Sequence, residues 1–352
     1  MVSNRKINML IFFFRDKNKK KWRQIIKEFT VLFIEKKKVP LYYISSLLYR
    51  ENVNNYKDYL SLEEGNKLLS WSYSHGKEEI VLTENKLLFE ELLVKNNIAT
   101  PQIFFHNSKN KFAYKGRFLE IENKTDFISF LALFFKESNI SRLFCKPKAG
   151  IKGQDIFIID KTTYKSIEDS LVNALLSQDF IFQEVIQQHK SLNRINPSCI
   201  NSLRIVTYKN EANQVEILAA TVRLGRSGSI VDNTHAGGMV VGLNMNNGKL
   251  KREGLQLIDN GGGIFYKHPE TEVVFENFQI PFLNEVKKIL TEASKLFKLP
   301  LLGWDVAITP EGPVLIEVNH NFFILFSDRF ENGLKNNPVF NKLYKQVIEG
   351  QS

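Results

Sequence analysis

The sequence GWDVAITPEGPVLIEVN, residues 303–319, predicts a β-hairpin with polar side chains on otherwise apolar strands. Its tight turn is expected at residues 310–312. Asp305 lies on the first strand, whereas Glu317 and Asn319 share one face of the second, because side chains alternate between the faces of a strand. The apolar neighbours indicate a buried sheet, where these groups are costly unless they bind a partner. Three oxygen donors of this kind suit Mg²⁺.

A hairpin end with solvated carboxylates is the alternative to a metal site. It suits Glu311, which falls within the expected turn. It suits Glu317 poorly, because Ile316 and Val318 flank that residue.

The sequence FCKPKAGIKGQDIFIID, residues 144–160, places a lysine at the end of an apolar strand and a glycine-containing loop after it. Lys146 would supply positive charge to a polyphosphate. Backbone N–H groups around Gly150 and Gly153 would approach it closely, because glycine has no Cβ. A solvated turn between two strands is the alternative.

Two arginines occupy apolar strands in the sequences NSLRIVTY (201–208) and TVRLGRSGSIVDNTHAGGMVVG (221–242). An unpaired guanidinium is expensive there, so Arg204 and Arg223 are each expected to face an anion, with a geometry that fits phosphate or carboxylate. A structural salt bridge to Asp305 or Glu317 is the alternative for either arginine. Residues 237–238, both glycine, offer either a backbone nest or a plain turn.

Hydrophobic periodicity predicts an α+β fold without regular alternation of strands and helices. Helices are expected over residues 22–38, 83–97, 164–177 and 282–298, with Thr83 as an N-cap. Strands are expected over residues 156–160, 180–186, 203–208, 215–224, 239–243, 303–308 and 313–318.

Composition excludes several classes of protein. The 352 residues include only two cysteines, Cys145 and Cys199, too few for a disulfide framework or a four-cysteine zinc module, which fits a reducing cytosol. Cys145 alternates to the face opposite Lys146 and is expected in the core. The apolar run at residues 9–14 is far shorter than the ~20 residues of a membrane span.

The net charge of +10 is concentrated at the start of the chain. Residues 1–38 hold twelve Lys or Arg against three acids, whereas the remainder holds 36 bases and 35 acids. Nucleic-acid binding by the body of the protein is therefore not expected. The same stretch forms an amphipathic helix, which either packs on the neighbouring lobe or binds anionic lipid. Its apolar face is Trp22, Ile25, Ile26, Phe29, Leu32 and Phe33.

Taken together, these motifs resemble the ATP-grasp superfamily, and within it the branch associated with sugar transfer and exopolysaccharide genes. The resemblance covers roughly residues 83–325. TENKLLFEELLVKNNIATPQ (83–102) is similar to the lysine-bearing helix of the family. The strand with its glycine loop, the FIFQEVIQQH hinge (180–189), the arginine strands and the D…E-x-N hairpin follow in the order typical of the family.

The resemblance implies a fold of two α+β subdomains that grip ATP, and it implies a role for each matching residue. Lys86 and Lys146 would hold the ATP phosphates under the loop of residues 149–154. Arg204 and Arg223 would neutralise the transferring phosphoryl group. The backbone of Gln183, Glu184, Val185 and Ile186 would meet the adenine edge, and Asp305, Glu317 and Asn319 would hold one or two Mg²⁺.

The chain departs from the family pattern after the hinge. Many relatives have an acidic residue for the ribose hydroxyls there, whereas this chain has Gln187, Gln188 and His189. His189 could contact the ribose, but a role behind the residues that touch the ligand, or a surface role, is expected instead. The expected division of the chain is a helical region over 1–80, the lysine and glycine-loop subdomain over 81–186 and the metal-binding subdomain over 187–352.

The activity implied by the resemblance is ATP-dependent carboxylate–amine ligation through an acyl phosphate. The expected substrates are an amino acid or small amine and a sugar-derived molecule in surface polysaccharide synthesis. A kinase of the same fold and a nucleotide-binding scaffold for glycosyltransferases remain as alternatives. The expected location is the cytoplasm, with peripheral contact at the inner face of the membrane through residues 1–38 as an open question.

Overall fold

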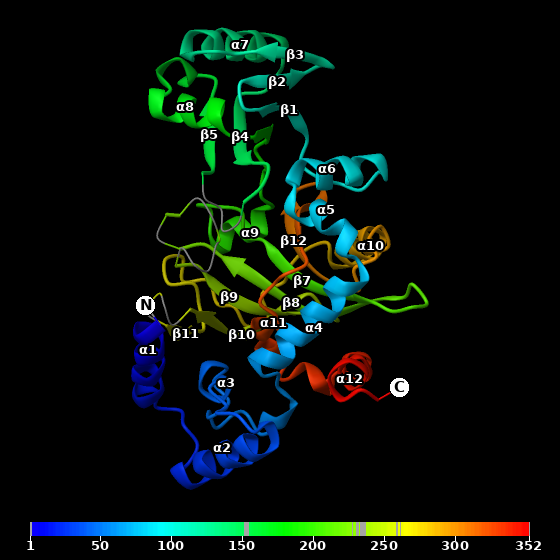
Figure 1. Ribbon diagram of the computed structural model, residues 1–352. Helices are drawn as coiled ribbons and strands as arrows, with labels where there is room; N and C mark the ends of the chain where they lie inside the picture. Colours follow the sequence, from blue (N-terminus) through cyan, green and yellow to red (C-terminus); the bar gives the residue numbers. More distant parts are fainter. Residues whose placement is uncertain are drawn as a thin grey trace. The chain divides into compact units, whose positions relative to one another are not determined.

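The computed structural model describes residues 2–150, 155–226, 228–229, 232, 237–257, 260 and 262–351 (Figure 1). Helices and sheets are both present, which confirms the α+β class. The chain forms two compact units. The larger unit comprises residues Met1–Ile80, Gln188–Pro313 and Val318–Ser352, and the smaller unit comprises Val81–Gln187 and Val314–Glu317.

The smaller unit is built on a six-stranded antiparallel sheet with the order β3-β2-β1-β6-β4-β5. Phenylalanines of this sheet and of one helix, α7, form much of its core, among them Phe105, Phe130 and Phe182. Its strands are β1 (Ile103–Ser108), β2 (Lys111–Tyr114), β3 (Arg117–Glu120), β4 (Arg142–Pro147), β5 (Phe157–Asp160) and β6 (Phe180–Glu184). Its helices are α5 (Ile80–Glu84), α6 (Lys86–Lys95), α7 (Lys124–Glu137), α8 (Asp169–Ser177) and the 3₁₀ turn η3 (Tyr164–Ser166).

The larger unit contains a seven-stranded sheet with the order β11-β10-β9-β8-β7-β12-β13. The long central strands are apolar, and β12 is buried over eight of its nine residues. Burial on both faces matches the near-continuous apolar sequence. The strands are β7 (Leu203–Lys209), β8 (Val215–Leu224), β9 (Met239–Asn244), β10 (Lys249–Gln256), β11 (Gly263–Phe265), β12 (Leu301–Thr309) and β13 (Gly312–Asn319).

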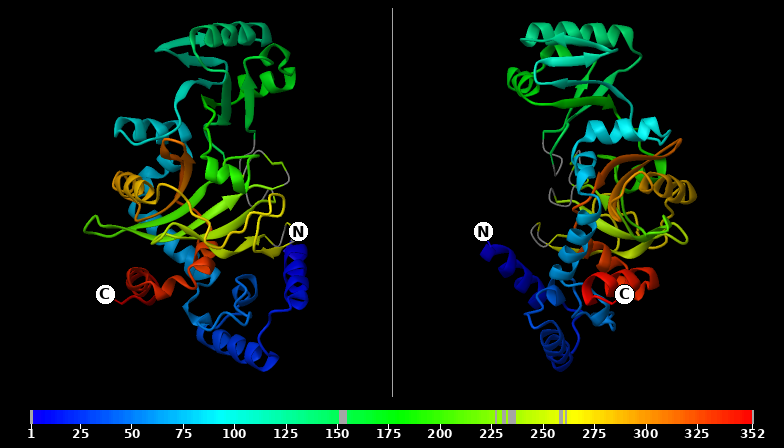
Figure 2. Two further views of the ribbon diagram at one scale, coloured as in Figure 1. Left: turned by 180° about the vertical axis from the view of Figure 1, so that it is seen from behind. Right: turned by 45° about the vertical axis from the view of Figure 1, so that its right-hand side comes forward.

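Helices from both ends of the chain cover this larger sheet (Figure 2). Residues of the N-terminal region share one apolar cluster with Val240, Leu255 and Phe330. A second cluster joins Leu60 and Leu68 to residues beyond 300. The α-helices are α1 (Val2–Arg15), α2 (Trp22–Lys36), α3 (Tyr42–Ser45), α4 (Leu62–His75), α9 (Lys190–Ile195), α10 (Leu283–Ser294), α11 (Ile324–Phe330) and α12 (Pro338–Tyr344). The short turns are η1 (Tyr56–Asp58), η2 (Lys77–Glu79), η6 (Leu334–Asn336) and the π-helical η7 (Lys345–Glu349).

The basic helix predicted over 22–38 is observed as α2, and only part of its apolar face packs on the protein. Ile25 and Leu32 are buried in the N-terminal cluster. Trp22, Ile26 and Phe33 remain exposed. Docking on the neighbouring lobe is therefore confirmed for Ile25 and Leu32. Trp22, Ile26 and Phe33 lie on the surface. Within the described part of the chain, no helix has the length and apolar character needed to cross a bilayer.

The local predictions hold best where the hydrophobic pattern is strong. Strand β8 has the predicted bounds, and the hairpin turn lies at Pro310-Glu311. The predicted N-cap at Thr83 was wrong. A helix break separates α5 from α6, and Asn85 caps α6 by accepting hydrogen bonds from the N–H groups of Leu87 and Leu88.

Candidate active site

An ion-pair cluster lies at the centre of the larger sheet. Arg204 on β7 is directly opposite Asp305 on β12. Its Nε and Nη2 atoms donate to the two carboxylate oxygens at 2.6 and 3.0 Å. Arg223 on β8 donates from Nη1 to Oδ2 of the same carboxylate at 3.2 Å. The strand order β8-β7-β12 thus brings two guanidiniums to one buried carboxylate, which is the salt-bridge alternative for both arginines.

Electrostatics in this cluster favour the ionised form of Asp305. Burial alone would raise the pKa of Asp305, but Arg204 and Arg223 outweigh it, and the pKa is lowered. A second carboxylate, Asp232, accepts hydrogen bonds from the N–H group of Ser202 at 2.7 Å and from its hydroxyl. Burial raises the pKa of Asp232, although Arg223 opposes the shift. Two carboxylates that interact with Arg223 therefore differ in their ease of ionisation.

The smaller unit holds a second cluster, around Lys146 at the end of β4. Its Nζ donates to Oε1 of Glu90 at 2.8 Å, and both side chains are buried. Glu90 lies on α6, one turn after Lys86, so both side chains share one face of the helix. The N–H group of Lys86 donates to the carbonyl of Lys148 at 2.8 Å and ties the start of the helix to the end of the strand.

Lys86 reaches the two remaining groups of this cluster. Its Nζ donates to the carbonyl of Gly150 at 2.8 Å and lies 3.7 Å from Oε1 of Glu317. Burial lowers the pKa of Lys86, against the opposing effect of Glu317. Burial raises the pKa of Glu90, against the effect of Lys146. The two lysines are thus held by carboxylates in a poorly solvated environment, where an incoming anion would interact strongly with them.

The hinge after β6 fits contact with a planar polar ligand. The strand ends at Glu184, whose N–H group donates to the carbonyl of Gln102 at 3.0 Å. Residues 185–189 belong to neither helix nor strand. Gln183 is buried, and its Oε1 has no hydrogen-bond partner among the described residues. Buried polar atoms are normally paired, so this oxygen is a candidate acceptor for a hydrogen bond from a ligand.

The glycine loop is described only in part. Gly150 has φ of 136°, which is accessible to glycine and strained for other residues. Gly153, with residues 151–154, lies outside the described residues. In the other glycine pair, Gly237 has φ of 97°, and its carbonyl accepts a hydrogen bond from Gln256 at 2.8 Å.

Two further expectations concern residues near the site. His189 caps α9, with its Nδ1 accepting from the N–H group of Ser191 at 3.1 Å, so it has a structural role. Cys145 is fully buried, and burial raises the pKa of its thiol, as expected of a core residue. The sequence interpretation missed Glu90. Its only signal was the four-residue spacing from Lys86 on an apolar helix face.

A family model for sugar-transfer associated ATP-grasp proteins matches residues 71–337. The chain belongs to this family. The resemblance inferred from the ordered motifs and the ATP-grasp fold are therefore confirmed. A search of curated proteins found no significant match.

Several solved structures of ligases and synthetases are similar to this chain at low sequence identity. The ligase PsnB, complexed with a minimal precursor, Mg and ADP, is 14% identical with a TM-score of 0.41, over 80% of this chain and 65% of PsnB. An L-amino acid ligase from Bacillus licheniformis is 14% identical with a TM-score of 0.42, over 76% and 47% of the two chains. The N5-carboxyaminoimidazole ribonucleotide synthetase from Thermotoga maritima is 11% identical with a TM-score of 0.37, over 72% and 48%. The chain thus spans about half to two thirds of the length of these structures.

The donor chemistry of the ATP-grasp hairpin fits Mg²⁺ unevenly. Glu317 and Asn319 offer carboxylate and amide oxygens, and the Asn319 Nδ2 atom is buried without a partner among the described residues. Both oxygens of Asp305 already accept hydrogen bonds from arginines. No group of three His, Cys, Asp or Glu side chains suited to a metal occurs in the described part of the chain. The binding of Mg²⁺ by Asp305 therefore stays a prediction, and it requires the arginines to release a carboxylate oxygen.

Proposed function

We propose that this ATP-grasp protein is an ATP-dependent carboxylate–amine ligase that works through an acyl phosphate. The observation that carries the proposal is the convergence of Arg204 and Arg223 on one buried carboxylate. Both side chains are part-exposed, so they are positioned to bind the oxygens of a transferring phosphoryl group.

The reaction has two steps. A substrate carboxylate oxygen attacks the γ-phosphorus of ATP, the bond from that phosphorus to the β–γ bridging oxygen breaks, and ADP leaves. An amine then attacks the acyl carbon, phosphate leaves with the electron pair of the acyl–oxygen bond, and the amine proton passes to solvent. Negative charge develops on phosphate oxygens in both steps. Stabilisation of that charge by positioned cations is most of what such a transfer requires.

Each predicted residue has a defined part in this reaction. Lys86 and Lys146 bind the ATP phosphates, and the backbone around Gly150 covers them. Gln183 and the backbone through Glu184, Val185 and Ile186 meet the adenine. Mg²⁺, held by Glu317 and Asn319 and joined by Asp305 if the arginines release it, would neutralise phosphate charge when bound.

Family membership also supports a sugar-linked substrate. The family description associates it with sugar transfer, and on this basis we infer that one substrate is derived from a sugar during surface polysaccharide assembly. The two cysteines are buried and unpaired, which is consistent with a reaction in the cytoplasm.

The test is the release of ADP and phosphate with and without candidate carboxylates and amines. Glu317→Gln removes a charge and keeps the shape, so turnover is expected to fall by orders of magnitude. Glu311→Gln, in the exposed turn of the same hairpin, is the matched control and is expected to leave turnover unchanged. Near-normal turnover by a folded Glu317→Gln protein would overturn the assignment. A stable phosphate ester as product, in place of an amide, would replace ligation by phosphorylation.

A further inference from the structure

Helix α1 exposes an apolar stripe to solvent. Residues 7–14 have the sequence INMLIFFF and carry no charge. At 3.6 residues per turn, the stripe spans about 100° and lies opposite the buried residues Met9 and Phe13. The side chains of the stripe are between 42 and 63% exposed, and they are Ile7, Leu10, Ile11 and Phe14. One face of α1 thus packs on the protein, and the other is apolar without a covering element among the described residues.

Helix α2 continues this surface and adds positive charge to it. Its exposed apolar side chains are Trp22, Ile26, Phe33 and Ile34, at 47 to 66% exposure. Arg23 and Lys27 are exposed on the same outward side. The ring of Trp22 lies 6.2 Å from that of Phe14 and 5.7 Å from that of Phe13, measured between centroids. The apolar surfaces of the two helices are therefore continuous.

The acids of this region do not offset its positive charge. Asp16 pairs with Arg50 at 3.3 Å. Glu28 pairs with Lys20 at 2.6 Å, and Glu35 pairs with Lys57. Within the described residues, no ion pair is recorded for six exposed bases of this region, namely Arg15, Lys17, Lys21, Arg23, Lys27 and Lys37. Because the three acids are paired with other bases, these six bases are a surplus of positive charge in this region.

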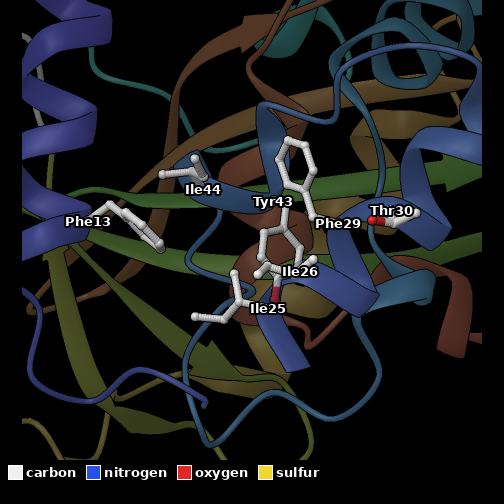
Figure 3. Close-up of a pocket in the computed structure, with 7 residues that line it drawn as sticks. All are labelled: Phe13, Ile25, Ile26, Phe29, Thr30, Tyr43 and Ile44. Carbon is white, nitrogen blue, oxygen red and sulfur yellow. The ribbon is translucent and has the colours of Figure 1, made fainter. Parts of the chain in front are cut away.

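An apolar pocket of about 240 Å³ lies within the same helical region (Figure 3). It opens outward, because Ile26 and Thr30 on its lining are exposed. The phenol of Tyr43 donates to Glu28 at 2.7 Å and is not available to water in the pocket. Its lining is Phe13, Ile25, Ile26, Phe29, Thr30, Tyr43 and Ile44. A pocket of this kind binds hydrocarbon better than water.

We propose that α1 and α2 dock the protein on an anionic lipid bilayer. The exposed apolar side chains enter the boundary between headgroups and acyl chains, and the six bases contact lipid phosphates. The positive charge favours anionic lipid over a second copy of this chain as the partner. A second copy would bring another positive surface into contact with this one, and the two would repel each other. The pocket accepts part of an acyl chain. Family membership does not contribute to this inference, and the matched residues 71–337 exclude both helices.

The first test is co-sedimentation of the full chain with vesicles. Vesicles of phosphatidylcholine with phosphatidylserine are compared with phosphatidylcholine alone, at low and high salt. Binding is expected with the anionic vesicles at low salt only, because salt screens the attraction to headgroups. Salt-insensitive binding to both vesicles, or no binding to either, would overturn the proposal.

Charge-reversal variants locate the surface. Arg23→Glu with Lys27→Glu is expected to weaken binding by about thirtyfold or more, since each base near the membrane contributes about 1 kcal/mol. The control is Lys288→Glu with Lys295→Glu, which reverses two exposed lysines in the region of α10. Equal losses in the two proteins would mean that only net charge matters and would overturn the assignment to α1 and α2.

Apolar variants separate lipid from protein as the occupant. Phe14→Ser with Ile11→Ser is expected to abolish vesicle binding and leave ATP hydrolysis unchanged. Phe118→Ser is the control, because Phe118 is 79% exposed on β3. Trp22 fluorescence is expected to shift to the blue with anionic vesicles. Self-association that the Phe14 and Ile11 substitutions remove, without vesicle binding by the parent protein, would assign the surface to a second copy instead.

Discussion

The two ion-pair clusters of this ATP-grasp protein neutralise a buried carboxylate to different extents. In the larger unit, Asp305 is shared by two arginines, and burial of the carboxylate is more than offset, so its pKa is lowered. In the smaller unit, Glu90 has one close cation, Lys146, and burial prevails, so its pKa is raised. A buried carboxylate that contacts two guanidiniums therefore stays ionised. The ionisation of a buried carboxylate that contacts one ammonium depends on that single cation.

The difference bears on function. We expect Asp305 to stay neutralised when an anion binds one of the arginines, because two guanidiniums contact its carboxylate. Lys146 is the sole close partner of Glu90 among the described residues, so a phosphate that attracts Lys146 also leaves Glu90 less well neutralised. We therefore expect that ATP binding through Lys146, as proposed, is coupled to the stability of the core around Glu90, whereas anion binding by the arginines is not.

The largest effect is expected from Lys146→Met. Removal of one partner of a buried ion pair costs about 3–5 kcal/mol, because the other charge remains buried. ATP affinity is expected to fall on the order of tenfold to a hundredfold, from loss of a charge-assisted hydrogen bond. Urea unfolding and calorimetric ATP titration measure the two effects.

A double variant separates the two roles of Lys146. Lys146→Met with Glu90→Met is expected to recover most of the stability, because no charge is then buried, and to leave ATP binding weak. Recovery of both properties would show that Lys146 serves the fold only.

Arg204→Met is expected to lower the free energy of unfolding by a smaller amount, about 1.5–3 kcal/mol, because Arg223 continues to neutralise Asp305. Arg204 makes two contacts with the carboxylate and Arg223 makes one, so Arg223→Met should cost less again. Chemical denaturation of both variants gives the order. A greater loss for Arg223→Met would mean that Asp232, which interacts with Arg223, contributes more to the cluster than Asp305 does.

Asp328 is a buried carboxylate that makes no ion pair with the other described residues, so it provides a third comparison. It accepts hydrogen bonds from the N–H groups of Leu60 and Leu334 at 2.8 and 2.7 Å, and burial raises its pKa to about 7. The unfolded chain ionises near 3.8, so this group contributes stability at low pH that is lost between 3.8 and about 7. Asp328→Asn is expected to lower the free energy of unfolding by about 1–3 kcal/mol near pH 4, and by less as the pH rises toward 7. A cost that does not change across this range would contradict the assignment.

The smallest effect is expected at an exposed pair. Lys115 lies 2.7 Å from Glu137, with side-chain exposures of 62 and 38%. Lys115→Gln is expected to leave the urea midpoint almost unchanged, because solvent screens the pair. The same urea series that ranks the buried pairs provides this value. A loss comparable to that of Arg204→Met would show that burial does not set the ranking.

The sequence predicted the larger sheet better than the smaller one. Strands β7, β8, β12 and β13 are long apolar runs, and their polar residues stand out for that reason. Strands β1 to β3 were missed because their turns, at Lys109 and Lys115, are formed by lysines with positive φ and lack the usual Asn-Gly or Asp-Gly signal. Helix α1 was missed because residues 9–14 are a short continuous apolar run, which by itself does not distinguish a helix from a buried strand.

Within the site, residue types were easier to predict than partners. An arginine in an apolar strand requires an anion, and that requirement was visible in the sequence. That both arginines share Asp305 follows from the strand order β8-β7-β12, which only the fold defines. In the sequence, Glu90 differs from its neighbour Glu91 only by its four-residue spacing from Lys86, and in the structure Glu90 lies on the buried face of the helix. The roles of Lys86, Lys146, Glu317 and Asn319 toward ATP and Mg²⁺ remain predictions.

The packing of the first sixty residues against the end of the chain has a consequence for protein synthesis. Tyr43, Tyr49 and Tyr59 bury their rings in a cluster completed by Phe330. Roughly 270 further residues must be translated after Tyr59 before that partner exists, which takes on the order of tens of seconds at ~5–20 residues per second. The nascent N-terminal segment, with its aromatic rings and surplus lysines, therefore stays uncovered for most of translation. Chaperone capture or early contact with a lipid surface would protect it during that interval.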